Sequence, residues 1–262
     1  MNNFMKKLLS IILVFISVST YAQELKPLLY KLNDKSYTGY YVTPESVNES
    51  TKTILIVHEW WGLNDYPKKR AIQLANEGYI AVCLDMYGTN IIATNPQSAS
   101  KLAGELYANR EMAYEIFKAG YEAAKTVQGV NPDKMAAIGY CFGGNIVLNV
   151  AKMGAPLDAV VSFHGNLSGP VIEKEKFTAA VLICNGAADT YVPVSEIDAM
   201  IKDLEVNGIN YKFINYEGAV HAFTNPASTE AGRKFKLQIA YSEEADKKSY
   251  QDFIRFIEQT VK

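Results

Sequence analysis

The sequence predicts an α/β fold with a mostly parallel, doubly wound sheet and helices on both faces. Short apolar runs rich in β-branched residues alternate with amphipathic stretches along most of the chain. An antiparallel opening, residues 28–32 and 37–42, precedes the first of these runs. Apolar strands that alternate with helices are typical of a parallel sheet that is covered on both sides.

Each predicted element is a short segment bounded by turn residues. We expect strands at residues 53–58, 80–84, 135–140, 159–163, 180–185 and 211–216. Helical periodicity predicts helices at residues 66–76, 110–127, 145–153, 194–207 and 242–260. Residues 88–100 and 223–238 are predicted to be irregular. They form the walls of a pocket beyond the carboxyl ends of the strands, or they are solvated loops.

The first 22 residues are expected to be a signal peptide. Lys6 and Lys7 precede the apolar run 8–18, and Ala22 offers a small residue for cleavage. A membrane-spanning helix needs about 20 apolar residues, more than this run contains. We therefore expect residues 23–262 to be exported as one domain, to the periplasm, without a stable membrane anchor.

Composition argues against two classes of protein. The chain has 26 Lys and Arg against 28 Asp and Glu, a net charge of −2, which does not favour nucleic acid as a partner. Its three cysteines form no Cys-x-x-Cys pair or Cys/His cluster, so we expect neither a metal site nor a cofactor. Cys83 and Cys184 fall on strands predicted to lie about 19 Å apart, whereas a disulfide needs Cα atoms within about 7 Å. Both thiols are predicted to be free and buried.

A short glycine-rich motif carries the strongest chemical signal. Cys141 lies in Gly-Tyr-Cys-Phe-Gly-Gly, between a predicted strand and a predicted helix. This is a nucleophile elbow with cysteine in place of serine. Gly139 and Gly143 are needed because strand and helix converge there, and the amides that begin the helix stabilise a thiolate. The alternative is a buried structural cysteine beside a glycine turn.

The order of the other candidate residues supports the elbow. Asp189 follows one predicted strand and His221 follows the next, and nucleophile, acid, histidine is the α/β-hydrolase order. His221 would accept the thiol proton and later assist water, while Asp189 would orient the imidazole. The amides of Phe142 and Trp60 are the expected oxyanion donors, because the fold takes one from each of these positions.

Three other polar residues also end predicted strands. His58 begins a run that resembles a zinc-protease motif, but Gly62 stands where the second histidine would be. His164 would contact substrate at the rim of the cleft or cap its strand. Asp85 is the alternative acid, but it precedes the nucleophile in the chain, so we assign it a structural role.

The sequence resembles the dienelactone hydrolase family over roughly residues 26–260. The resemblance implies an α/β-hydrolase fold, hydrolysis of an ester or lactone, and a triad formed by Cys141, Asp189 and His221. It rests on HEWWGLN at 58–64, LDMYG at 84–88, GYCFGG at 139–144, GAADTYVP at 186–193, HAFTNP at 221–226 and AYSEEADKKSY at 240–250.

The resemblance also implies a role for Glu59, as a carboxylate that holds the resting thiol and responds to substrate. If Trp60 and Trp61 help to bury Glu59, its pKa should be raised, which would let it exchange a proton with Cys141. The alternative is a structural ion pair with a base such as Arg70.

The substrate pocket is less well defined by the sequence. Our candidates for its walls are Trp61, Tyr87, His164, Phe223 and Asn225. Well-known members of the family bind the carboxylate of dienelactone with two arginines, and neither is present at the matching positions of this chain. Without a bidentate arginine the resemblance does not extend to dienelactone itself as the substrate.

Three functions are compatible with the sequence. The first is an exported carboxylesterase-like hydrolase of a small ester or lactone, with Cys141 as nucleophile. The second is an exported binding protein that keeps the pocket and uses Cys141 only structurally. The third is a secreted peptidase, which is disfavoured because such enzymes usually carry a further domain or long insertions.

Overall fold

The computed structural model describes residues 24–262. The predicted signal peptide, residues 1–22, and its cleavage after Ala22 lie outside the described residues. Within the described part of the chain, no helix combines the length and the apolar character needed to cross a membrane.

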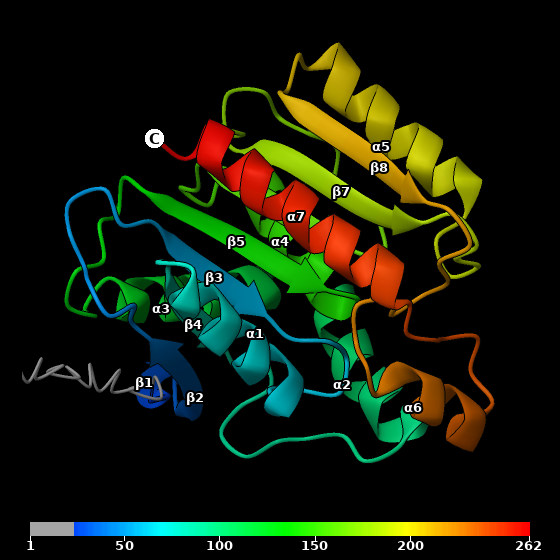
Figure 1. Ribbon diagram of the computed structural model, residues 1–262, viewed down its shortest axis with the longest axis horizontal. Coiled ribbons are helices and arrows are strands. Elements are labelled where there is room, and N and C mark those ends of the chain that lie inside the picture. Colours follow the sequence, from blue (N-terminus) through cyan, green and yellow to red (C-terminus); the bar gives the residue numbers. More distant parts are fainter. Residues whose placement is uncertain (1–23) are drawn as a thin grey trace, which may run out of the picture.

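One eight-stranded sheet forms the centre of the molecule (Figure 1). Its order is β1-β2-β4-β3-β5-β6-β7-β8. The strands from β3 to β8 pair in parallel, whereas β2 is antiparallel to both β1 and β4. This confirms the mostly parallel sheet and its antiparallel opening. The strands are β1 Lys26–Leu32, β2 Lys35–Val42, β3 Thr53–Val57, β4 Ile80–Leu84, β5 Met135–Tyr140, β6 Ala159–Phe163, β7 Ala180–Gly186 and β8 Tyr211–Tyr216.

Helices cover both faces of the sheet, as predicted (Figure 1). Side chains of α1 and α7 share one apolar core with the sheet, and side chains of α3, α4 and α5 share the other. Every residue of β3 to β7 is buried, which explains why these strands are apolar throughout rather than alternating. The helices are α1 Asp65–Asn76, α2 Pro96–Ala108, α3 Arg110–Ala124, α4 Phe142–Lys152, α5 Val194–Val206, α6 Ser228–Phe235 and α7 Glu243–Thr260.

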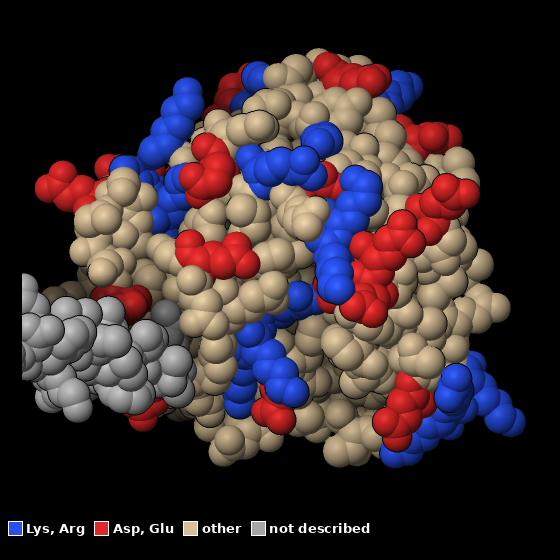
Figure 2. Space-filling model, in the orientation of Figure 1, with Lys and Arg blue, Asp and Glu red and all other residues tan. Residues whose placement is uncertain are grey.

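Because the strands from β3 to β8 all run in one direction, their carboxyl ends meet at one end of the sheet, where α2 and α6 lie (Figure 1). This end of a doubly wound sheet is where ligands bind. On the face shown in Figure 2, acidic and basic side chains are intermixed, and no single basic area covers it.

The helix α2 corrects the prediction that residues 88–100 are irregular. Its start carries a capping box, a signal that was not used in the prediction. The side chain of Asn95 accepts a hydrogen bond from the amide of Ser98, and the Ser98 hydroxyl accepts one from the amide of Asn95. Proline occupies the first helical position, where its missing N–H costs nothing.

The helix α6 lies inside residues 223–238, so that part of the prediction was also wrong. It has no side-chain cap, and only Ser228 and Gly232 are buried. The sequence therefore lacks both the start signal and the apolar stripe that mark a helix packed on a core.

The structure confirms that Cys83 and Cys184 are free and buried. Burial raises the pKa of both thiols, that of Cys184 to about 12. In the native protein, iodoacetamide is therefore expected to label Cys141 and to leave these two unmodified until urea unfolds the chain. Peptide mass spectrometry measures this, and labelling of either buried thiol as fast as Cys141 would contradict it.

Candidate active site

Three side chains from different loops meet at the carboxyl end of the sheet. Cys141 follows β5 directly, Asp189 follows β7, and His221 follows β8. His221 Nε2 lies 3.0 Å from Cys141 Sγ, and His221 Nδ1 lies 2.8 Å from Asp189 Oδ2. Asp189 and His221 are buried, while Cys141 is half-buried. The structure thus brings together the three residues that chain order singled out.

The turn at Cys141 has the crowding that the sequence predicts. Cys141 adopts φ 53° and ψ −114° and serves as the N-cap of α4. A Cβ at Gly139 would lie 2.0 Å from the carbonyl oxygen of Gly143, and a Cβ at Gly143 would lie 2.3 Å from the carbonyl oxygen of Val57. Only glycine fits at either position. The positive φ at Cys141 is a strained backbone conformation, and the surrounding packing holds the residue in it.

The imidazole of His221 lies between two groups that favour its protonated form. Burial by itself lowers the pKa of His221. The charge of the Cys141 sulfur and the hydrogen bond and charge of Asp189 outweigh burial and raise the pKa well above its ordinary value. An imidazole held in this way can take the proton of the thiol and keep it beside the reacting atoms.

The two backbone amides predicted to bind an oxyanion come from different loops: Phe142 follows Cys141 directly, and Trp60 follows β3. Within the described residues, the amides of Phe142 and Trp60 donate no hydrogen bond. Phe142 is the first residue of α4, where an amide has no partner inside the helix. The peptide that contains the Trp60 amide is held through the carbonyl of Glu59, which accepts a 3.1 Å hydrogen bond from the amide of Gly62. Both predicted oxyanion donors are therefore available to a ligand.

Glu59 is buried, with 3% exposure, and its Oε2 accepts a 2.6 Å hydrogen bond from Asn225 Nδ2. Burial raises the pKa of Glu59 to about 7, although the Asn225 hydrogen bond and the charges of His221 and Arg70 oppose the change. Among the described residues Arg70 pairs with Asp246 and not with Glu59. The alternative prediction of a structural ion pair between Glu59 and Arg70 is therefore wrong.

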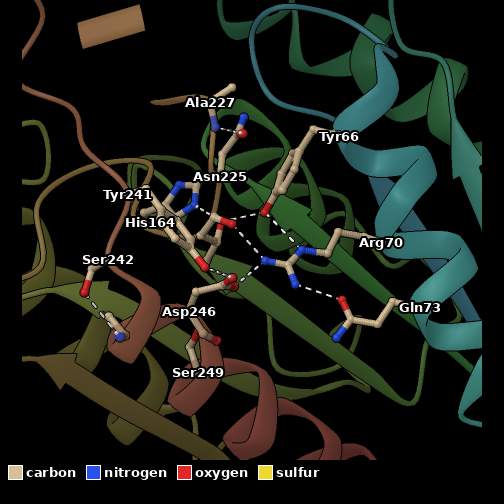
Figure 3. Close-up of polar contacts among 12 residues, drawn as sticks. Tyr66, Arg70, Gln73, His164, Asn225, Ala227, Tyr241, Ser242, Asp246 and Ser249 are labelled. Atoms are coloured by element: carbon tan, nitrogen blue, oxygen red, sulfur yellow. Dashed lines mark hydrogen bonds and ion pairs between the residues drawn. The ribbon is translucent and has the colours of Figure 1, made fainter. Parts of the chain in front are cut away.

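The Arg70–Asp246 pair supports the loop that carries the histidine (Figure 3). Arg70 extends from α1 and Asp246 from α7, and both are buried. Besides pairing with Asp246, Arg70 Nη2 donates a 2.8 Å hydrogen bond to the carbonyl of Thr224, which lies between His221 and Asn225. One buried cation therefore ties two helices to the same loop.

His164 also belongs to this network and not to the cavity. Its Nε2 lies 2.7 Å from Thr224 Oγ1, which in turn accepts a 2.7 Å hydrogen bond from the Tyr66 hydroxyl (Figure 3). The His164 ring meets that of His221 edge to face, with centroids 5.3 Å apart. His164 thus packs behind the histidine and does not reach a ligand.

The remaining histidine and the alternative acid are structural. His58 is fully buried, with Nδ1 2.6 Å from the Glu59 carbonyl and Nε2 accepting from the amide of Met86. Asp85 Oδ1 accepts hydrogen bonds from the amides of Tyr87 and Gly88 and so closes the turn after β4. Neither is free to take part in chemistry at Cys141.

A cavity of about 560 Å³ opens at Cys141 and is large enough for a small organic ligand. Of the predicted wall residues, Trp61 and Asn225 line it. Its walls come mainly from loops and from the two helices that the sequence did not reveal. They are formed by Glu59, Trp60, Trp61, Asn64, Ala93, Thr94, Tyr107, Cys141, Asn166, Ser168, Tyr191, His221, Ala222, Asn225, Ala227, Ser228, Ala231, Lys234, Phe235, Leu237 and Ile239.

Tyr87, His164 and Phe223 were predicted as wall residues and are not among them. Each is at most 2% exposed. Tyr87 packs on the ring of Phe142, with centroids 5.3 Å apart, while His164 and Phe223 pack on each other. All three side chains therefore pack in the interior of the protein and not along the cavity.

Sequence reasoning missed the part of the cavity wall that helices contribute. Tyr107 comes from α2, and Lys234 and Phe235 come from α6. The capping signal at Asn95, the proline after it and the helical spacing of Ala99, Ala103 and Leu106 were the sequence features that could have identified α2. Among the described residues, no group of three His, Cys, Asp or Glu side chains is placed to hold a metal ion.

Comparison with known proteins agrees with this geometry. The family model described as "Dienelactone hydrolase family" matches residues 37–261. Protein usf of Aquifex pyrophilus is 29% identical over 218 residues, 81% of this chain and 93% of its own. A dienelactone hydrolase-like promiscuous phosphotriesterase from metagenomic libraries superposes with a TM-score of 0.86 at 28% identity, covering 92% of this chain and 100% of that one.

The likeness extends to more distant proteins at the level of the fold. An acylaminoacyl peptidase of Pyrococcus horikoshii matches 92% of this chain with a TM-score of 0.68 and 16% identity, and the match spans 42% of the peptidase chain. Together with the closer structure, this confirms the α/β-hydrolase fold.

We expect Arg70→Met to lower the free energy of unfolding by about 3–5 kcal/mol, because it leaves the Asp246 carboxylate buried without a partner. The double variant Arg70→Met/Asp246→Leu should recover much of the loss, since an apolar pair has no uncompensated charge. Urea unfolding at neutral pH measures both. A single variant as stable as the wild type, or a double variant less stable than the single, would argue against this role.

Titration of Glu59 should appear in the pH dependence of stability. Folding raises its pKa from 4.5 to about 7, so between these values the folded protein binds more protons and stability falls as pH rises. Across this range the wild type should lose about 3 kcal/mol relative to Glu59→Gln, which does not titrate. Urea unfolding at several pH values tests this, and parallel curves for the two proteins would count against it.

Proposed function

The chain belongs to the dienelactone hydrolase family, and we propose that it hydrolyses a small ester or lactone with Cys141 as the nucleophile. One observation carries the proposal: the sulfur of Cys141, the imidazole of His221 and the carboxylate of Asp189 form a continuous chain of 3.0 Å and 2.8 Å contacts that opens into the cavity. This is the geometry that an activated nucleophile requires.

In the first half of the reaction, His221 takes the proton of Cys141, and the thiolate attacks the carbonyl carbon of the ester. The amides of Phe142 and Trp60 bind the oxygen as it becomes negative. The carbon–oxygen bond to the alcohol then breaks, and the alcohol leaves with the proton from His221. The acyl group remains on the sulfur as a thioester. For a lactone, the alcohol stays attached to the acyl group as the ring opens.

In the second half, His221 accepts a proton from water, and the resulting hydroxide attacks the thioester. The carbon–sulfur bond breaks, the acid is released, and the sulfur regains its proton from His221. Asp189 keeps the imidazole in the orientation that serves both halves, through its 2.8 Å contact with Nδ1.

Glu59 is proposed to couple the resting thiol to substrate binding. It lines the same cavity as Cys141, and with a pKa of about 7 it can bind or release a proton near neutral pH. Its hydrogen bond to Asn225 links it to the loop of His221, so a substrate that displaces this contact would change the charge beside the nucleophile.

The walls indicate the general kind of substrate. Trp60, Trp61 and Phe235 form a continuous aromatic side, with neighbouring ring centroids 5.0 and 5.8 Å apart. Lys234 is the one Lys or Arg among the described residues that line the cavity, and it is exposed. This supports an ester or lactone with an apolar body, without the paired arginines that would grip a planar carboxylate.

We further propose that the enzyme acts after export. The support is the sequence alone, in which a lysine pair and a short apolar run precede Ala22. Residues 23–262 would then be the mature protein, a single hydrolase domain in the periplasm.

Cys141→Ala is expected to abolish turnover of p-nitrophenyl esters while the protein remains folded, because no other group can form the thioester. The measurement is release of p-nitrophenol, over a panel of esters, lactones and a phosphate triester, with circular dichroism to verify folding. The family assignment motivates the first two classes and the phosphotriesterase relative motivates the third.

Cys83→Ser is the matched control, because it changes a thiol that is buried within β4 and keeps a donor for the Pro67 carbonyl. It should retain wild-type turnover. Full activity in Cys141→Ala would refute the assignment. A wild type inactive on the whole panel, with Cys141 no more reactive than a model peptide thiol, would favour the non-catalytic binding protein.

A further inference from the structure

We propose that the hydroxyl of Tyr107 is a third donor to the reacting carbonyl oxygen, which makes Tyr107 a catalytic residue supplied by α2. The inference rests on the proposed function, because it concerns the same acyl transfer at Cys141. It goes beyond that function by assigning a side chain to the step in which negative charge develops.

The position of Tyr107 follows from how its ring packs. Tyr107 lies near the end of α2 and is half-buried. Its ring meets that of Phe142 with centroids 5.5 Å apart and an interplanar angle of 58°. Phe142 is fully buried and is also held by the rings of Tyr87 and His58. The phenol is therefore fixed beside the residue whose amide is one of the two backbone donors.

The hydroxyl of Tyr107 is free to bind a ligand. Tyr107 lines the cavity together with Cys141, and within the described part of the chain its hydroxyl makes no hydrogen bond. Tyr87, which packs on the same phenylalanine, differs in this respect because its hydroxyl is used by the Trp60 carbonyl. Among the described residues, no hydrogen bond joins Tyr107 to the Cys141 sulfur, so the thiol does not occupy the hydroxyl either.

The chemistry of the phenol suits a donor. Burial first, and then the charges of Cys141 and Glu196, raise the pKa of Tyr107, so the hydroxyl keeps its proton at working pH. A neutral phenol can donate a hydrogen bond to the oxygen of the tetrahedral intermediate, where the charge is greatest, and no proton is transferred in doing so. A fixed donor of this kind favours the intermediate over the substrate.

Tyr107→Phe tests the proposal, because it removes one oxygen and keeps the ring on Phe142. We expect kcat for p-nitrophenyl acetate to fall roughly tenfold to a hundredfold, with KM little changed, since a donor to the developing oxyanion acts mainly in the transition state. The loss should be equal for methyl acetate, because the donor serves the carbonyl oxygen and not the leaving group.

Two controls separate this role from a structural one. Tyr114→Phe changes a half-buried tyrosine of α3 that packs on the same core and does not line the cavity, and it should keep wild-type kcat. The rate of alkylation of Cys141 by iodoacetamide should be unchanged in Tyr107→Phe, because that reaction forms no oxyanion. Melting temperatures verify that both variants fold.

A wild-type kcat in Tyr107→Phe overturns the proposal. A loss accompanied by slower alkylation also overturns it, because the tyrosine would then act through the thiol. So does a loss confined to methyl acetate, which would place the hydroxyl at the leaving group. If the wild type hydrolyses no ester at all, the proposed function itself fails, and this outcome is distinct from the other three.

Discussion

The close approach of strand and helix at Cys141 is the constraint on which the rest of the site depends. The backbone at this residue is held at φ 53°, and the space around it excludes even a methyl group at Gly139 and Gly143. Because the turn is this tight, the sulfur projects from the sheet while the next amide remains unpaired at the start of a helix. The positions of the sulfur and of the unpaired amide beside it thus follow from one local geometry.

The histidine, in contrast, is positioned from a distance. His221 lies on a loop, and loops hold geometry poorly unless the surrounding structure fixes them. Here the support is polar and buried: Arg70 of one helix donates to the Thr224 carbonyl within the loop, and Asp246 of another helix pairs with Arg70. Burying a charged pair costs desolvation free energy. The Arg70–Asp246 pair lies beside the loop of His221, where a buried ion pair can favour a single conformation of the loop.

The sequence was sufficient for the features that local geometry dictates. The parallel strands could be predicted because both faces are buried, and Cys141, Asp189 and His221 could be selected because each follows a strand in the expected order. What could not be predicted depends on packing between distant segments. Tyr107 reaches the cavity only because α2 lies across the end of the sheet, and His164, which follows a strand just as His221 follows one, turns into the core instead.

The weakly anchored helix α6 has a consequence for how such proteins diversify. It contributes a wall of the cavity through Ala231, Lys234 and Phe235, yet only Ser228 and Gly232 of its residues are buried. Changes on its inward face can therefore reshape the space for an acyl or alcohol group at little cost to the two apolar cores. Substitutions in α6 can therefore change which ligand fits the cavity, while Cys141, Asp189 and His221 stay in place.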